Sequence, residues 1–210
     1  MSSEPAGRHP LLVVISAPSG AGKTTLCDRL VSIRPDIVRS VSCTTRAPRG
    51  GEEHGKAYFF LSDEEFERRA AEGAFLEHAT VHGFRYGTLR GTVDECMKRG
   101  LSVILAIDVQ GAAQVRARVT GLPAADPLRR GFVDIFVEPP SMEVLRSRLT
   151  LRGEDAAEVV ERRLRNAEGE MEQRCLFKYR LVNDSLDRAV AEALRILEHE
   201  ARLAGSAAKV

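Results

Sequence analysis

The stretch ISAPSGAGKTTL, residues 15–26, decides how the rest of the chain is interpreted. It begins inside the apolar run LLVVIS (11–16), which is rich in β-branched residues and therefore predicts a strand buried on both faces. A glycine-rich turn follows, and helical periodicity begins near Lys23. A strand, a glycine-rich turn and a helix in immediate succession form one unit of an α/β fold.

The residue types of this turn suit the binding of phosphate groups. Glycine lets the backbone curl so that successive N–H groups point inward, and the helix N-terminus adds partial positive charge. The Lys23 ammonium can reach the β- and γ-phosphates, and the Thr24 hydroxyl can ligate Mg²⁺. The pattern predicts a loop that binds a nucleoside triphosphate, with a tight turn that binds nothing as the alternative. The positions expected to contact that nucleotide are Ala17, Pro18, Ser19, Gly20, Ala21, Gly22, Lys23, Thr24 and Thr25.

One position departs from the usual loop, because Ala17 stands where such loops commonly open with glycine. Glycine is required there only if φ is positive or if a β-carbon would collide with phosphate or a neighbouring strand. Alanine is the smallest chiral residue, and Gly20, Gly22, Lys23 and Thr24 are all present. We therefore expect the loop to hold a nucleotide.

Composition narrows the range of partners. The 210 residues include 31 basic and 30 acidic side chains, so no overall field points to nucleic acid or to a membrane surface as a partner. No apolar run approaches the roughly 18 residues of a membrane span, and residues 1–9 are expected to be a flexible tail. The cysteines form no CxxC pair, which argues against a disulfide framework or zinc site and suits the cytoplasm. They are Cys27, Cys43, Cys96 and Cys175.

Strand and helix patterns alternate along much of the chain. Each of three further apolar runs precedes helical periodicity, which predicts crossover units and a parallel sheet covered on both faces. The runs are 101–108, 132–139 and 179–184, and the helices that follow them are 110–119, 142–151 and 186–203. A further, heavily charged helix is predicted at 155–174, and the proline- and glycine-containing segment 120–131 is predicted to be a surface loop.

Residues 40–92 differ from this alternation. Ser62 and Glu65 form a capping-box pattern at the start of one helix, and Gly73 ends it. The segment 75–89 alternates around a tight turn, as in a hairpin. Short strands and one helix between two units of a parallel sheet predict an inserted mixed α+β subdomain.

The insertion also carries candidate anion-binding residues. Arg46 and Arg49 are three residues apart around Pro48, and two guanidinium groups so placed can fork onto one phosphate. Tyr58 and Tyr86 can add hydroxyl donors. A solvated basic loop is the alternative interpretation of the segment TTRAPRGGE.

The combined motifs resemble those of the guanylate kinase family. They are SAPSGAGKTTL, SCTTRAPRGGEEHGKAYFF, FLEHATVHGFRYGT, LAIDVQG, LRGED and VND, and they extend in order over residues 15–184. The resemblance implies a parallel-sheet P-loop kinase core flanked by helices, with a GMP-binding subdomain and a helical lid. Within a domain at 10–205, the core is expected at 10–39, 93–145 and 166–205, the subdomain at 40–92 and the lid at 146–165.

The resemblance also implies a site for guanosine monophosphate. The phosphate contacts match Arg46, Arg49, Tyr58 and Tyr86, and the base contacts match Ser42, Glu77 and Thr88. A carboxylate at Glu77 suits guanine, because it can accept hydrogen bonds from both N1–H and the 2-amino group, whereas adenine would leave it unpaired. Asp108, at the end of a predicted strand, is expected near the acceptor nucleotide and the Mg²⁺ water shell.

The lid is expected to supply positive charge to the transferring phosphoryl group. Arg148, Arg152 and Arg163 match the lid arginines of the family, and Asn183 is expected near the adenine of ATP. With Lys23, these arginines form the expected catalytic set, and no general base is needed because the attacking phosphate is already ionised. The alternative is a solvated helical face, in which Arg162, Arg163 and Arg165 pair with Glu158 and Glu161.

Two positions and one loop depart from the family pattern. Ala106 stands where an aspartate is usual, Phe84 where an asparagine is common, and the 120–131 connection is longer than usual. Two other signals are discounted. His78 and His82 are four residues apart on a strand pattern without a third ligand, so we expect no zinc there. Arg68–Arg69 and Arg129–Arg130 are expected to be exposed charge.

The expected activity is therefore transfer of a phosphoryl group from ATP to GMP, with Mg²⁺, for purine nucleotide metabolism and GTP supply. A catalytically inactive, protein-binding relative of the guanylate kinases is one alternative, although Lys23, Thr24, Arg46 and Arg49 are present. A P-loop kinase for another phosphorylated acceptor is a second alternative, which Glu77 disfavours. Either a monomer or a homodimer is compatible with the sequence.

Overall fold

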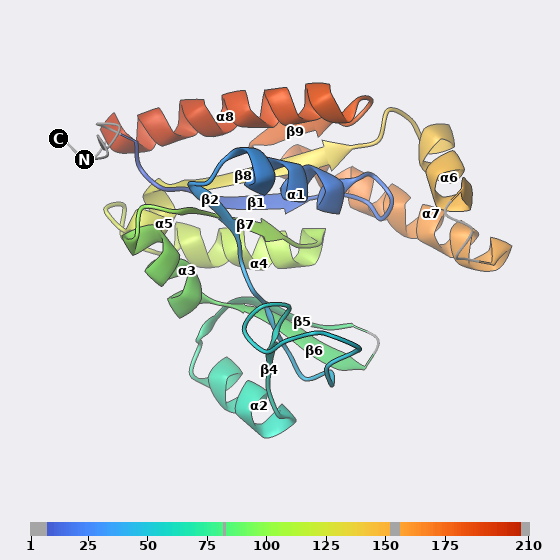
Figure 1. Ribbon diagram of the computed structural model, residues 1–210. Coiled ribbons are helices and arrows are strands. Elements are labelled where there is room, and N and C mark those ends of the chain that lie inside the picture. Colours follow the sequence, from blue (N-terminus) through green and yellow to red (C-terminus); the bar gives the residue numbers. More distant parts are fainter. Residues whose placement is uncertain (1–7, 82, 152–155, 207–210) are drawn as a thin grey trace.

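The core of the protein is a five-stranded parallel sheet of order β2-β7-β1-β8-β9 (Figure 1). The computed structural model describes residues 8–81, 83–151 and 156–206. The strands of this sheet are β1 Leu12–Ser16, β2 Ile37–Arg39, β7 Ser102–Ala106, β8 Phe132–Glu138 and β9 Tyr179–Val182. The predicted α/β class and parallel sheet are confirmed, and β2 is an edge strand that the sequence patterns did not indicate.

Strand β1 shows why the sheet is buried on both faces. Val13 and Ile15 pack into one hydrophobic cluster, whereas Leu12 and Val14 pack into a second cluster on the opposite face. All four are fully buried, and each such side chain contributes roughly 1.5–3 kcal/mol of transfer free energy. A continuous apolar run is therefore required, rather than an alternating one.

Helices cover both faces of the sheet (Figure 1). On one face lie α1 Lys23–Ile33 and α8 Leu186–Ser206, and on the other lie α3 Arg90–Lys98, α4 Val109–Thr120 and α5 Pro127–Arg130. Within the described part of the chain, no helix is both long and apolar enough to cross a membrane.

The short helix α5 corrects the prediction of a surface loop at 120–131. The Asp126 side chain accepts a hydrogen bond from the Leu128 N–H at 2.9 Å, Pro127 occupies the first turn, and Leu128 is buried in the core. Proline suits the first turn of a helix because no intrahelical bond is lost there. The same residues that suggested an irregular loop thus begin a helix, and their tertiary packing stabilises it. Helix α3 was likewise not predicted.

The insertion forms a second, mixed sheet of order β4-β3-β6-β5. Its strands are β3 Cys43–Thr44, β4 Phe59–Phe60, β5 Phe75–Val81 and β6 Phe84–Leu89, and α2 Asp63–Ala71 packs beneath them (Figure 1). The rings of Phe66 and Phe75 stack with centroids 4.5 Å apart, and both are buried with Cys43 in a separate small core. The predicted mixed α+β subdomain is confirmed.

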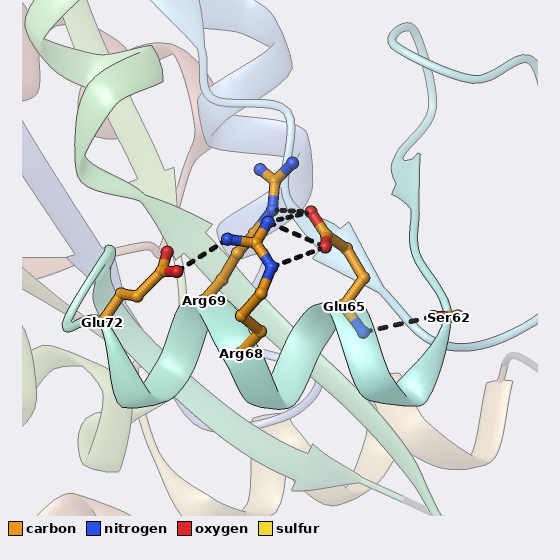
Figure 2. A network of polar contacts seen from close by, with 5 residues as sticks. All are labelled: Ser62, Glu65, Arg68, Arg69 and Glu72. Atoms are coloured by element: carbon orange, nitrogen blue, oxygen red, sulfur yellow. Dashed lines mark hydrogen bonds and ion pairs between the residues drawn. The ribbon is translucent and has the colours of Figure 1, made fainter.

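The predicted capping box of α2 is only half formed, as Figure 2 shows. The Ser62 hydroxyl accepts from the Glu65 N–H at 3.2 Å, but the Glu65 carboxylate binds Arg68 and Arg69 further along the helix. Arg68 also pairs with Glu72 at 2.7 Å. Arg68 is exposed, as predicted, whereas Arg69 is half-buried. Exposed pairs such as that of Arg68 with Glu72 contribute little to stability.

Two helices at the carboxyl end of the sheet pack against each other. They are α6 Met142–Leu151 and α7 Ala157–Glu172, which share a cluster made of Leu145, Leu149, Val160, Leu164 and Ala167. A short 3-10 helix, Gln173–Leu176, connects α7 to β9.

Candidate active site

The phosphate loop joins β1 to α1 and depends on glycine at two positions. Gly20 and Gly22 have φ values of 91° and 94°, a region that side chains with a β-carbon disfavour. A β-carbon at Gly22 would also lie 2.3 Å from the Asn183 Nδ2 atom. Ala17, in contrast, is buried within the hydrophobic core. Alanine at that position therefore contributes to packing at the base of the loop.

Asn183 supports the loop from the end of the last core strand. Its Nδ2 donates to the Ala21 carbonyl at 2.8 Å, and its own backbone carbonyl accepts from Arg148 Nη2 at 2.8 Å. Asn183 also lines a cavity of about 400 Å³ together with Gly22 and Arg148. The expected contact with adenine stays a prediction, while the structure shows a direct role of Asn183 in holding the loop.

Lys23 begins α1 and points toward the end of β7. Its Nζ donates to the Ile107 carbonyl at 2.8 Å. Burial lowers the pKa of Lys23, and the nearby Asp108 carboxylate opposes that shift. The residues predicted for the phosphate loop line a cavity of about 300 Å³ with Asp108 and Glu170, apart from Ala21, which is buried.

A second cavity, of about 510 Å³, lies between the core and the inserted sheet. It is lined by six of the residues expected to contact the acceptor: Ser42, Tyr58, Glu77, Tyr86, Thr88 and Asp108. Ala106 also lines it. Asp108 borders both cavities and caps α4 by accepting from the Gly111 N–H at 2.8 Å. The donor and acceptor cavities therefore meet at one carboxylate.

Glu77 and Thr88 face each other across β5 and β6. The Thr88 hydroxyl donates to Glu77 Oε1 at 2.6 Å, and both residues are buried. Burial raises the pKa of Glu77, while the bond from Thr88 opposes the shift. A buried carboxylate has two acceptor oxygens, so it suits a ligand that offers paired hydrogen-bond donors.

The raised pKa of Glu77 predicts a stability cost. Between the ordinary pKa and the raised one, the folded state keeps a proton that the unfolded state releases, so stability falls as pH rises through this window. We expect Glu77→Gln to raise the Tm at pH 7 by roughly 2–4 °C, the shift that about 1 kcal/mol produces in a chain of this size. At a pH well below the ordinary pKa of a glutamate, the side chain is protonated in both states, so the difference in Tm between the variant and the wild type should disappear. Thermal unfolding at several pH values tests this, and a variant less stable at pH 7 would contradict it.

The arginine loop is organised by a residue that sequence reasoning did not single out. Glu52 accepts from Arg46 Nη2 at 2.9 and 3.0 Å with its two oxygens, and from the Arg49 N–H at 2.8 Å. Arg46 is buried and lies over the Tyr58 ring at 5.5 Å, whereas Arg49 is exposed. Neither arginine lines the acceptor cavity itself. The signal for Glu52 was its position in the motif TTRAPRGGE, in which an acidic residue follows Arg49 by three residues.

We expect Glu52→Gln to raise the KM for GMP roughly tenfold, because a charge-assisted contact that orders Arg46 and the loop is weakened. The KM for ATP should be unchanged. Glu53→Gln is the matched control, since Glu53 pairs only with exposed Lys56 among the described residues. A lower KM for GMP in the Glu52 variant would show instead that repulsion between Glu52 and the phosphate outweighs its ordering effect.

The expected lid residues lie on α6 and α7. Arg148 is half-buried beside the phosphate loop and Arg163 is half-exposed on α7, while Arg152 lies outside the described residues. Glu161 pairs with Arg146 and so joins the two helices. Glu170, which sequence reasoning missed, projects from α7 into the phosphate-loop cavity; burial raises its pKa, and Lys23 opposes that shift.

Comparisons with known proteins agree with this arrangement. The guanylate kinase family model matches residues 9–200. The chain is 45% identical to a guanylate kinase of Geobacter metallireducens, over 92% of this chain and 90% of that protein, and 48% identical to one of Neisseria gonorrhoeae, over 91% and 89%. A crystal structure of guanylate kinase from Anaplasma phagocytophilum superimposes with a TM-score of 0.68 at 33% identity, covering 92% of this chain and 87% of that one. With the phosphate loop, the inserted sheet and the two adjoining cavities, these matches show that the chain belongs to the guanylate kinase family of ATP-dependent phosphotransferases.

Proposed function

We propose that the protein transfers the γ-phosphoryl group of ATP to GMP, giving ADP and GDP, at the junction of its two cavities. The observation that carries the proposal is that one cavity contains the buried Glu77 carboxylate, the other is lined by the phosphate loop, and Asp108 borders both. A carboxylate that selects guanine and a loop that holds triphosphate would thus face one another across Asp108.

The proposed chemistry rests on positioning and on neutralising charge. The acceptor phosphate has a second pKa of about 6, so it is already ionised near neutral pH and needs no general base. Lys23 would neutralise the transferring phosphates, and Arg148, Arg152 and Arg163 would approach from the lid. Arg46, Arg49, Tyr58 and Tyr86 would hold the GMP phosphate, while Ser42, Glu77 and Thr88 would contact the base.

The phosphate-loop cavity also suits the Mg²⁺ that the family implies. Thr24 offers an exposed hydroxyl at the start of α1, and the Asp108 and Glu170 carboxylates line the same cavity. Oxygen donors of this kind match the preference of Mg²⁺, which retains much of its water shell. We propose that Thr24 ligates the ion together with the nucleotide phosphates, whose charge the ion would neutralise.

The division of the chain into a core, an inserted subdomain and a lid supports a closing motion. We propose that residues 40–92 and 146–165 close over the bound nucleotides and exclude water, which would prevent wasteful hydrolysis of ATP. These boundaries rest on the sequence. We further propose that the enzyme works in the cytoplasm on ATP and GMP as a monomer or homodimer, without nucleic acid or membrane partners.

The direct test supplies ATP with GMP, AMP, CMP or UMP in turn and follows the release of ADP. We expect rapid turnover with GMP and at least 10²-fold lower kcat/KM with AMP, because adenine leaves the buried Glu77 carboxylate unpaired. Equal or greater turnover with AMP would overturn the assignment of guanine. Omitting Mg²⁺ should abolish turnover with every acceptor.

A further inference from the structure

Strand β5 is irregular at the position of Glu77. Its register with β6 pairs Phe75 with Leu89 and Glu77 with Thr88, so two steps along β5 correspond to one step along β6. This is a β-bulge, a feature that commonly re-aims a side chain beside a functional site. The direction of the Glu77 carboxylate is therefore not set by a regular ladder with β6.

Three consecutive buried residues at the bulge have three different surroundings. Phe75 packs in the small core of the inserted sheet, whereas Leu76 packs in the core cluster that includes residues of α4. Glu77 comes next and lines the acceptor cavity. A regular strand would alternate its side chains between two faces, so contacts from outside the inserted sheet are needed to hold this arrangement.

Gln114 supplies such a contact from α4. Its Nε2 donates to the His78 carbonyl at 3.0 Å, and its Oε1 accepts from the His78 N–H at 3.1 Å. Because β5 is the edge strand of its sheet, these two bonds replace those that a further strand would make. One side-chain amide therefore fixes the backbone immediately after Glu77.

Helix α4 also carries the residue at the junction of the two cavities. Asp108 caps its first turn, and the Glu77 Oε2 atom lies 3.3 Å from the position of a β-carbon built at Gly111. Thr88 bonds the same carboxylate but belongs to the same inserted sheet as Glu77. Thr88 therefore orients the carboxylate within the sheet, whereas α4 sets the position of that sheet edge relative to Asp108.

We propose that Gln114 is a positioning residue for guanine selection, which holds the β5 backbone so that Glu77 meets the guanine edge at a set distance from Asp108. Gln114 does not line the acceptor cavity, and it acts through the His78 peptide. The inference rests on the proposed transfer to GMP and deepens it.

The test uses Gln114→Met, which keeps side-chain length and helix propensity but removes both hydrogen bonds. We expect the KM for GMP to rise roughly tenfold, because the His78 N–H and carbonyl lose their partners. We expect the KM for ATP to stay within about twofold. The ratio of kcat/KM for GMP to that for IMP, which lacks the 2-amino group, should fall roughly tenfold. The reason is that a displaced carboxylate no longer accepts a hydrogen bond from that group.

Arg118→Ala is the matched control, because Arg118 is exposed on the same helix. Gln114→Glu is the second variant. It keeps the length and polarity of the side chain but, when ionised, cannot donate to the His78 carbonyl. It therefore tests the loss of that hydrogen bond if the methionine variant is unstable. Tm values for all variants separate altered selection from loss of folded protein.

Wild-type GMP kinetics and wild-type preference over IMP in a folded Gln114 variant would overturn the inference. An equal rise in the KM for GMP and the KM for ATP, with an unchanged ratio of kcat/KM for GMP to that for IMP, would also overturn it. Such a result would show that Gln114 has a merely structural role. If the wild-type enzyme does not phosphorylate GMP, the proposed function itself fails. If the wild type and Arg118→Ala phosphorylate GMP and the Gln114 variants have the same KM for GMP and the same preference over IMP, only this inference fails.

Discussion

Replacing Lys23 by methionine is expected to lower kcat by roughly 10²–10³-fold, the loss usually caused by removing one preorganised group that stabilises transition-state charge. The Lys23 ammonium lies in the phosphate-loop cavity, close enough to the end of β7 to donate to the Ile107 carbonyl at 2.8 Å. Methionine preserves the apolar stem but provides no positive charge for the transferring phosphoryl group. The measurement is kcat with saturating ATP and GMP.

The same substitution should not unfold the protein. Burial lowers the pKa of Lys23, so at pH 7 the folded state bears a cost for the charged ammonium that methionine removes. We therefore expect an equal or slightly higher Tm. Lys98→Met, at an exposed position of α3, is the control and should retain full activity. A Lys23 variant with nearly wild-type kcat would refute the assigned role of the phosphate loop.

The second large effect is expected at Glu77, where alanine should raise the KM for GMP by roughly 10²-fold. The buried carboxylate can accept both donors of the guanine edge, and hydrogen bonds to a charged group are among the stronger ones in a protein interior. The KM for ATP should change far less, because the phosphate-loop cavity does not include Glu77. Steady-state kinetics with each substrate varied in turn distinguish these effects.

Base selection gives an independent readout of the same variant. Glu77→Ala should lower the ratio of kcat/KM for GMP to that for AMP by roughly 10²-fold, because adenine no longer leaves a buried carboxylate unpaired. Glu95→Ala, at an exposed position of α3, is the control. A larger effect on ATP than on GMP would remove Glu77 from the base site.

Local patterns in the sequence were sufficient for the elements that carry the donor site. The apolar run before the phosphate loop, the glycines within it and Lys23 after it are close together in the chain, so their joint meaning is visible without the fold. The acceptor residues were placed by family resemblance, and the structure brings Ser42, Tyr58, Glu77, Tyr86, Thr88 and Asp108 to one cavity. The proline and glycine content of 120–131 was misleading because packing overrides it at α5, where burial of Leu128 stabilises a segment that was predicted to be a loop.

The sequence by itself thus determined the fold class, the phosphate loop and the chemical types of the acceptor site. Only the tertiary structure decided how these groups are held. The Asn183 side chain reaches the Ala21 carbonyl across 162 positions of sequence, and the Gln114 amide reaches His78 across 36. The physical reason is that hydrogen bonds of this kind depend on distance and direction between separate elements, which no local pattern specifies. The same holds for the raised pKa of Glu77, because it arises from burial that exists only after the inserted sheet has docked on the core.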